Sequence, residues 1–270
     1  MRTFGIIVNS YKDEGLEYAE RVLAFLSERG ACAFVLEAVS PECMASIEKA
    51  DFLVVLGGDG TMLAASAYAA CKNIPLIGIN FGNLGFLTDV EKEQGFSSLS
   101  KVLEGDYSLE KRMLLEADFP TAKPLPLAER LALNEVNICG NGRLTEFSVY
   151  VGESPLNVFR ADGVVVATPT GSTAYSLSAG GPLLMPSAKM SVITPISPHS
   201  LGTRPFVIDN THSVRIVIRG RATVIIDGKA RGLLASGQSA SVQASSCEAS
   251  IIKTVSSNIY TTLRKKKMIL

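Results

Sequence analysis

The order of apolar and polar residues alternates between two patterns over the first 80 positions. Residues 4–8 and 51–56 are short, almost uninterrupted apolar runs, which predict strands buried on both faces. Residues 13–29 place apolar side chains every three or four positions and are followed by Gly30, a pattern typical of an amphipathic helix and its C-cap. Further strands are predicted at 31–36 and 74–80, and a further helix at 61–70. This alternation predicts a parallel α/β sheet with helices on both faces.

A different pattern begins near residue 107, where helical spacing fades and short β-rich runs follow one another. Gly, Pro, Asn and Ser turns separate these runs, which is typical of a sandwich or a related pair of sheets. The predicted strands are 131–138, 146–151, 163–167, 191–194, 214–218, 222–226, 240–243 and 249–254. We therefore expect an α/β domain over residues 1–107 and an all-β domain over residues 108–255.

The most informative local sequence is Gly57-Gly58-Asp59-Gly60, which joins the strand at 51–56 to the next helix. Glycines let a backbone approach a phosphate closely, and a helix start offers free N–H groups and positive potential. A carboxylate is normally unfavourable beside phosphates. Asp59 could deprotonate an attacking hydroxyl or hold Mg²⁺, although capping the helix would explain it equally well.

A second candidate site lies in residues 160–182, where a strand runs into a turn rich in Pro, Gly and hydroxyl groups. The hydroxyl-bearing side chains are Thr170, Ser172, Thr173, Tyr175, Ser176 and Ser178. This density favours a phosphorylated, polyhydroxylated ligand such as a nucleotide over hydroxyls that only satisfy the turn. The nucleophile-elbow, Walker A and strict dinucleotide-binding glycine motifs are absent from the sequence. Asn134 and Glu135, which interrupt an apolar strand, are a third and weaker candidate.

Composition narrows the function further. Lys plus Arg and Asp plus Glu number 26 each, so we expect no bulk attraction to nucleic acid or membrane, and the basic run 264–267 is interpreted as a solvated segment. The five cysteines are scattered without a CxxC pair, and no apolar run is long enough to span a bilayer. We expect reduced thiols, a cytoplasmic location and no dedicated protein metal site.

Taken together and in order, these clusters resemble one family, the NAD kinases. The resemblance rests on Gly57-Gly58-Asp59-Gly60, Asn134-Glu135, Asp162-Gly163 and the string Thr168-Pro169-Thr170-Gly171-Ser172-Thr173-Ala174-Tyr175. The last string is the most specific, because other kinases of lipids and sugars share the first turn. The sequence from 194 to 205 and Asp227-Gly228 also resemble the family, whereas Lys229 stands where many members have Gln.

The resemblance implies transfer of the γ-phosphoryl group of ATP, or of polyphosphate, to the 2′-hydroxyl of the adenosine ribose of NAD. Asp59 would be the general base, and Gly57 and Gly58 would contact phosphates, with Mg²⁺ or another divalent metal present. The implied substrate-binding residues are Gly60, Asn134, Glu135, Arg143, Arg160, Asp162, Thr173, Ala174, Tyr175, Ser176, Leu177, Ser178 and Ser197. A homodimer or homotetramer is also implied, as is the return of residues 256–270 to the first domain.

Two alternatives stay open on the sequence. A lipid or sugar kinase would share the Gly-Gly-Asp-Gly turn but would leave the hydroxyl-rich sequence at 168–178 unexplained. A catalytically silent dinucleotide sensor would explain both, although the retained Asp59 argues against it. The sequence leaves open the phosphoryl donor, the preference between NAD and NADH, feedback by NADP(H), the oligomer size and the role of Lys229.

Overall fold

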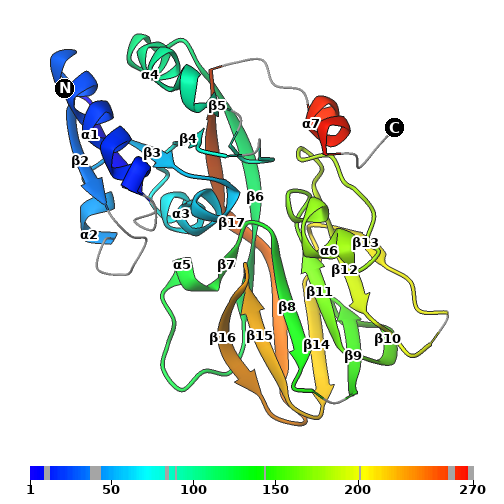
Figure 1. Cartoon of the computed structure of the whole chain (residues 1–270). Coiled ribbons are helices and arrows are strands. Elements are labelled where there is room, and N and C mark those ends of the chain that lie inside the picture. The colour runs from blue at the N-terminus through cyan, green and yellow to red at the C-terminus, as the bar shows by residue number, and fades with distance from the viewer. Residues whose placement is uncertain are drawn as a thin grey trace. The chain divides into compact units, whose positions relative to one another are not determined.

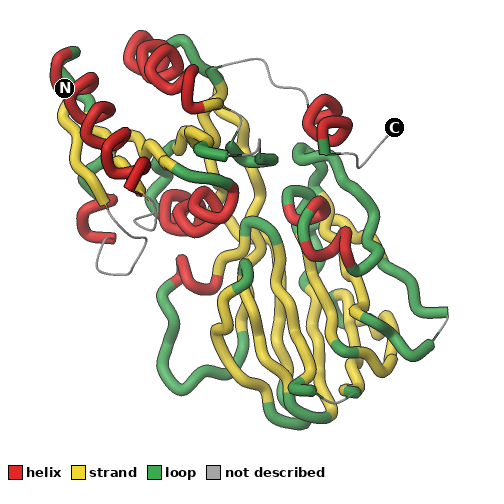
Figure 2. Tube along the Cα trace, viewed as in Figure 1, coloured by secondary structure: helices red, strands yellow, loops and turns green. Residues whose placement is uncertain are grey.

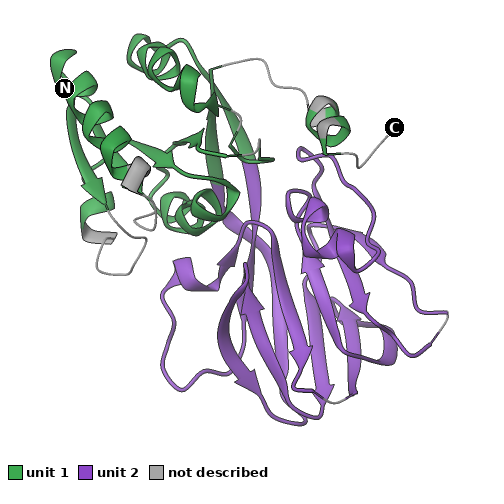
Figure 3. Ribbon diagram, in the orientation of Figure 1, with its two compact units in different colours: residues 1–111, 249–270 green, residues 112–248 purple. Residues whose placement is uncertain are grey.

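The computed structural model describes residues 1–8, 13–36, 44–82, 85–88, 90–142, 144–200, 202–254 and 259–266. The chain divides into two compact units, Met1–Lys111 with Ala249–Leu270 and Arg112–Glu248 (Figure 3). Helices are frequent in the first unit, whereas strands make up most of the second (Figure 2).

The first unit is built on a parallel sheet with the strand order β4-β3-β1-β2 (Figure 1). Its elements are β1 (Thr3–Val8), α1 (Asp13–Glu28), β2 (Cys32–Leu36), α2 (Met44–Ile47), β3 (Phe52–Leu56), α3 (Asp59–Cys71), β4 (Leu76–Asn80), β5 (Val90–Glu91), the 3-10 helix η2 (Lys92–Gln94), α4 (Gly95–Glu104) and α7 (Ile259–Lys265). All five residues of β3 and of β4 are buried, which explains why these strands are apolar without alternation.

The helices of the first unit differ in how much of their surface is buried. On α1, Tyr18, Ala19, Val22 and Leu26 are buried and form one apolar face, as the spacing predicts. On α3, buried side chains occur in a nearly continuous run from 65 to 70, so this helix lies deep in the unit. Its first residue, Asp59, is thereby fixed at the carboxyl end of β3.

The second unit contains a six-stranded antiparallel sheet with the order β13-β12-β11-β8-β15-β16, and a further set of antiparallel strands that includes β10, β9 and β14. Its elements are β6 (Ser108–Asp118), which begins in the first unit, α5 (Leu127–Arg130), β7 (Leu131–Ala132), β8 (Glu135–Gly140), β9 (Thr145–Val151), β10 (Ser154–Ala161), β11 (Gly163–Ala167), η3 (Gly171–Thr173), α6 (Tyr175–Ser178), β12 (Met190–Ile196), β13 (Phe206–Asp209), β14 (Val214–Arg219), β15 (Ala222–Ile226), β16 (Lys229–Leu234) and β17 (Ser239–Lys253). Side chains from both sets, among them Val136, Val164, Phe147 and Ile216, form one buried core.

The predicted fold class is confirmed, but β6, β10, β13 and β16 were not predicted, and two predictions of where a strand is continuous were wrong. The strands predicted at 240–243 and 249–254 are one strand, β17, which pairs with β14 near Ser239 and with β4 at Ile251. The return to the first sheet is therefore made by β17, ahead of the segment that was expected to make it. The strand predicted at 131–138 is divided into β7 and β8. The N–H groups of Leu133 and Asn134, between these two strands, donate to the Asp227 carboxylate and not to a neighbouring strand.

Candidate active site

In the first unit the Gly-Gly-Asp-Gly turn joins β3 to α3. A Cβ atom at Gly57 would lie 2.6 Å from the Thr61 hydroxyl, so close packing requires glycine there. At Gly58 and Gly60 a Cβ atom would meet nothing within 4 Å, so packing does not explain these two glycines. Open space beside them, together with the first N–H groups of α3, which have no partner within the helix, leaves room for an anionic ligand to approach the backbone.

Asp59 is oriented by the loop that follows β4. Its Oδ2 accepts a hydrogen bond from the Phe86 N–H at 2.7 Å. Its Oδ1 accepts from the N–H groups of Leu87 at 3.0 Å and Thr88 at 3.2 Å, and from the Thr88 hydroxyl at 3.2 Å. A Cβ atom at Gly85 would overlap the carboxylate, so the loop passes directly against it. Since each carboxylate oxygen has about two acceptor positions, Oδ2 can accept a further hydrogen bond, whereas Oδ1 is fully used.

In the second unit a comparable set of hydrogen bonds surrounds Asp227, which follows β15 in a tight turn. Its carboxylate accepts from the N–H groups of Leu133 at 2.7 Å, Asn134 at 2.9 Å and Glu135 at 3.0 Å. Asp227 itself has φ 46° and the next residue, Gly228, has φ 77°, a backbone shape that Asp and Gly tolerate well. Burial raises the pKa of Asp227 to about 6, although the three backbone donors and Lys229 act in the opposite direction.

Glu135, the first residue of β8, is a buried acid beside Asp227. It is 6% exposed, and its Oε2 has no hydrogen-bond partner within the described part of the chain. Burial and, secondarily, the charge of Asp227 raise the pKa of Glu135 to about 7, while a hydrogen bond from the Tyr175 N–H lowers it. A buried carboxyl oxygen without a partner is costly, so a ligand donor at this position would be strongly favoured.

The structure brings the Asn134–Glu135 cluster and the 168–175 turn together. The Thr168 hydroxyl donates to the Leu133 carbonyl at 2.6 Å, and the Thr168 N–H donates to the Asn134 carbonyl at 2.9 Å. A Cβ atom at Gly171 would overlap that same Asn134 carbonyl, which explains the glycine. The two predicted clusters are therefore one assembly.

Tyr175 and Asp162 lie on the exposed side of this assembly. Tyr175 is 40% exposed, and Asp162, just before β11, is exposed too. Burial raises the pKa of Tyr175, and the negative charges of Cys139, Asp162 and Glu135 raise it further. An exposed ring beside two carboxyl groups can stack on a base while the carboxyls accept from sugar hydroxyls.

Several hydroxyls of the 168–178 segment serve the protein itself. Ser172 donates to the Pro169 carbonyl, Thr173 to the Thr170 carbonyl, and Ser176 is fully buried and paired with Thr194 at 2.9 Å. Thr170 accepts from the buried Arg112 at 3.1 Å. These bonds fit the structural explanation of the hydroxyls, and only Tyr175 and Ser178 of that set are exposed.

The remaining predicted residues that the structure describes are partly or fully exposed. Ala174 and Leu177 are partly exposed around α6, and Ser197 is exposed with φ 47°. The Arg160 side chain is exposed and lies nearest Glu146, with Nε 3.8 Å from Oε2. Arg143 lies outside the described residues. Lys229 begins β16 and is exposed, close enough to Asp227 to lower the pKa of that carboxyl.

Two parts of the site could not be identified from the sequence. Nothing local in the sequence of the Gly85–Thr88 loop indicates that its N–H groups bind Asp59. Asp227 was noted for family resemblance but was not assigned a role. In both cases the partners are distant in the sequence, so only the fold reveals them.

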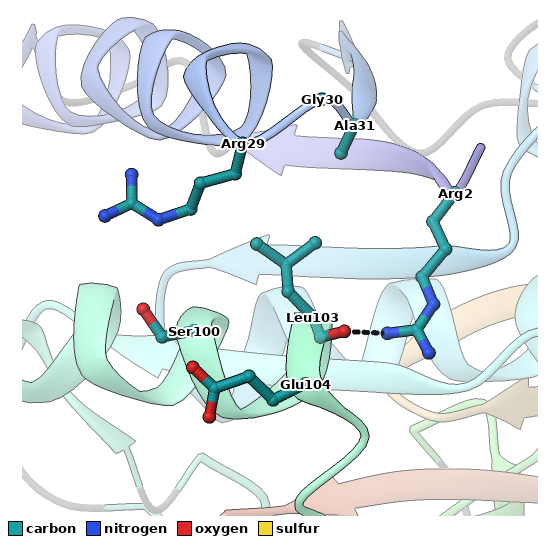
Figure 4. A pocket seen from close by; sticks show the side chains of 7 residues that line it. All are labelled: Arg2, Arg29, Gly30, Ala31, Ser100, Leu103 and Glu104. Atoms are coloured by element: carbon teal, nitrogen blue, oxygen red, sulfur yellow. Dashed lines mark hydrogen bonds between the residues drawn. The ribbon is translucent and has the colours of Figure 1, made fainter.

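A cavity of about 400 Å³ in the first unit does not belong to this site. It lies near the amino ends of β1 and β2, whereas Asp59 lies at the carboxyl ends of the parallel strands. Its lining includes Arg2, Arg29 and Glu104 (Figure 4). Arg2 donates to the carbonyls of Val102 and Leu103, both at 2.6 Å, which neutralises the C-terminal end of α4. Ligands of parallel sheets bind beyond the carboxyl ends of the strands, so we assign this cavity no substrate.

No group of three or more His, Cys, Asp or Glu side chains among the described residues could hold a metal ion. None of the described helices is both long and apolar enough to cross a membrane.

Comparison with known proteins gives consistent matches along the chain. The ATP-NAD kinase N-terminal domain matches residues 42–107, and the ATP-NAD kinase C-terminal domain matches residues 133–254. The NAD kinase of Heliobacterium modesticaldum is 37% identical and that of Ruminiclostridium cellulolyticum is 34% identical, each alignment covering 98% of both chains.

Two solved structures share the fold. An NAD kinase from Archaeoglobus fulgidus in complex with ATP is 26% identical, with a TM-score of 0.78 and 94% of each chain covered. Yeast NADH kinase complexed with NADH is 23% identical, with a TM-score of 0.83, covering 98% of this chain and 87% of the other.

Proposed function

The chain belongs to the NAD kinase family and has the activity of that family, and we propose that Asp59 is the group that activates the acceptor hydroxyl. The orientation of its carboxylate supports this assignment. Oδ1 is held by three donors, whereas Oδ2 is held by the Phe86 N–H and keeps an acceptor position. A hydroxyl that donates to Oδ2 would have its oxygen aligned for attack.

The proposed transfer is a direct displacement. The 2′-oxygen of the NAD adenosine ribose attacks the γ-phosphorus of ATP, the bond from that phosphorus to the β–γ bridging oxygen breaks, and ADP leaves. The hydroxyl proton passes to Asp59 Oδ2. Little proton transfer is needed before attack in a loose transition state, so a carboxylate is a sufficient base.

Charge neutralisation would come from backbone donors and a divalent ion. Gly58 and Gly60 leave the backbone at the start of α3 accessible to phosphate oxygens, and Gly57 is proposed as a further phosphate contact. Mg²⁺ carried by the ATP phosphates would neutralise the charge on the transferred group, and the Asp59 carboxylate is of the ligand type that Mg²⁺ prefers.

Recognition of NAD is assigned to the second unit. The strongest support is the buried Glu135 Oε2, which lacks a partner in the described residues and would accept a hydrogen bond from a ribose hydroxyl or a base amino group. Asn134, Asp162 and Ser178 would contribute further polar contacts, and Tyr175 an aromatic face. Thr173, Ala174, Ser176 and Leu177 would contribute mainly by shaping the turn, and Ser197 and Arg160 remain proposed contacts.

Two further properties stay predictions. A homodimer or homotetramer follows from the resemblance, and its test is the mass in solution by light scattering. A cytoplasmic location follows from the scattered cysteines, of which Cys32, Cys71, Cys139 and Cys247 are free thiols.

The deciding experiment is NADP formation by the purified protein with NAD, ATP and Mg²⁺, with Asp59→Asn assayed alongside. Activity in the wild type that the variant lacks supports the role of Asp59. Equal activity in the two proteins would remove Asp59 from the mechanism. Parallel assays with polyphosphate and with NADH would identify the preferred donor and acceptor.

A further inference from the structure

The residue after the C-terminal helix α7 contacts the loop that orients Asp59. The Lys266 Nζ lies 4.7 Å from the centroid of the Phe86 ring. The Phe86 N–H donates to Asp59 Oδ2 at 2.7 Å. All three residues belong to the first unit, so a chain of two contacts connects the C-terminal segment with the carboxylate.

We propose that Lys266 is a positioning residue for phosphoryl transfer, which holds Phe86 so that Asp59 Oδ2 keeps its orientation. The proposal rests on the function assigned to Asp59 above. Lys266 need not touch either substrate to have this effect, because its contact acts through the ring and backbone of Phe86.

The residues that donate to the two Asp59 oxygens differ in how deeply they are buried. Leu87 is 3% exposed and Thr88 is fully buried, so the donors to Oδ1 are fixed by the interior of the unit. Phe86 is only partly buried, and it supplies the donor to Oδ2, the oxygen with an acceptor position left for substrate. A cation over the Phe86 ring restrains the donor to Oδ2, which is less buried than the donors to Oδ1.

Two features of helix α7 hold Lys266 in place. Leu263 is 7% exposed and anchors the helix, and the Lys266 N–H donates to the Thr262 carbonyl at 3.0 Å, which extends the last turn. A positive charge at a helix C-terminus is favoured by the helix dipole. The distance of 4.7 Å is within the range of about 6 Å over which a cation is attracted to a ring face.

The first experiment compares steady-state kinetics of the wild type with three variants. Lys266→Ala is expected to lower kcat by about three- to ten-fold while the KM values for NAD and ATP stay unchanged, the scale of one cation–π contact. Lys266→Arg should retain most of the activity, because a guanidinium also stacks on a ring. Arg29→Ala is the matched control, since Arg29 lies 3.7 Å from the Phe25 ring at the opposite sheet edge and should leave kcat unchanged.

A double-mutant cycle identifies the route of the effect. If Lys266 acts through the ring, adding Lys266→Ala to Phe86→Leu should cause no further loss of kcat. A loss that persists in the Phe86→Leu protein and raises the KM for ATP would mean that Lys266 binds donor phosphates directly, and would overturn the proposal. An unchanged kcat in Lys266→Ala would overturn it as well.

Hydrogen exchange of the Phe86 amide provides a readout that does not depend on activity. This amide should exchange at least about three-fold faster in Lys266→Ala than in the wild type, and Arg29→Ala should not change it. Unchanged exchange would contradict the positioning role even if the wild type formed no NADP. If the wild type formed no NADP but the Phe86 amide still exchanged faster in Lys266→Ala, the result would count against the proposed function and not against the positioning role.

Discussion

Asp59 and Asp227 are held by nearly the same hydrogen bonds in two different surroundings. Each follows an apolar strand, precedes a glycine, and accepts three backbone N–H groups from a loop distant in the sequence. Asp59 stands at the start of a helix beside open glycines. Asp227 stands in a tight turn and accepts from Leu133 and Asn134, which lie between β7 and β8, and from Glu135, the first residue of β8.

The difference shows how one arrangement can serve two purposes. In the first unit the loop fixes the carboxylate, and the carboxylate is the group proposed to act. In the second unit the carboxylate fixes the loop, and the proposed contacts come from Asn134 and Glu135 on that loop. The same hydrogen bonds therefore orient a reactive group in one case and shape a recognition surface in the other.

The largest expected effect is on Asp59. Asp59→Asn should lower kcat about 100-fold or more, because it removes the proton acceptor, while NAD binding changes little. The unfolding free energy should fall by about 1–2 kcal/mol, because an amide cannot accept from all three N–H groups of the loop. Steady-state kinetics measure the change in kcat, and calorimetry measures the affinity for NAD. A variant that loses NAD affinity and keeps kcat would mean that Asp59, like Asp227, only shapes its surroundings.

Asp227→Asn should give the opposite pattern. An amide cannot accept from all three N–H groups, so the protein should lose about 2 kcal/mol of unfolding free energy and the KM for NAD should rise about ten-fold, with a smaller change in kcat. Thermal denaturation and kinetics test this prediction. If kcat fell as far as in Asp59→Asn, the distinction between the two aspartates would be lost.

The third prediction concerns pH and Glu135. Its pKa is raised from 4.5 to about 7 in the folded protein, so the folded state binds the proton more tightly and the stability contributed by Glu135 falls as pH rises from about 4.5 to 7. Glu135→Gln removes this loss. The melting temperature of the variant relative to the wild type should therefore be higher at pH 8 than at pH 5, by the equivalent of about 1–2 kcal/mol. A difference independent of pH would mean that Glu135 is already ionised at pH 5.

The smallest effect is expected at Tyr175. Tyr175→Ala should weaken NAD binding by about five-fold, because an exposed ring contributes stacking rather than structure. The melting temperature should change by less than about 2 °C, as is usual for exposed side chains. Unchanged affinity by calorimetry, with a large loss of stability, would instead make Tyr175 part of the packing of the second unit.

The fold was largely predictable because buried strands and helix faces are apolar in the sequence. The apolar runs at 52–56 and 76–80 are fully buried parallel strands, and the spacing on α1 matches its buried face. β17 was harder, because its middle is polar and partly exposed and local patterns divide it into two strands. β10 was missed for a related reason, since most of its residues are exposed.

The site was only partly predictable. Glycines around Asp59 follow a local rule, so the turn could be identified, but the donors to Asp59 and Asp227 come from residues that only folding brings close. The hydroxyls at 170–178 show the limit most clearly. Sequence cannot distinguish a hydroxyl available to a ligand from Ser176, whose hydroxyl is buried against Thr194.

The continuity of β17 has a consequence for the order of events during biosynthesis. β4 pairs with β3 soon after both are made, but its pairing at Leu76 requires Ile251, which the ribosome adds only after the whole second unit. Until then this edge of the parallel sheet is paired only at Ile79 and Asn80, with β5, and the rest of it can associate with other chains. We therefore expect nascent chains that end before Ile251 to depend on chaperones and to aggregate when these are scarce.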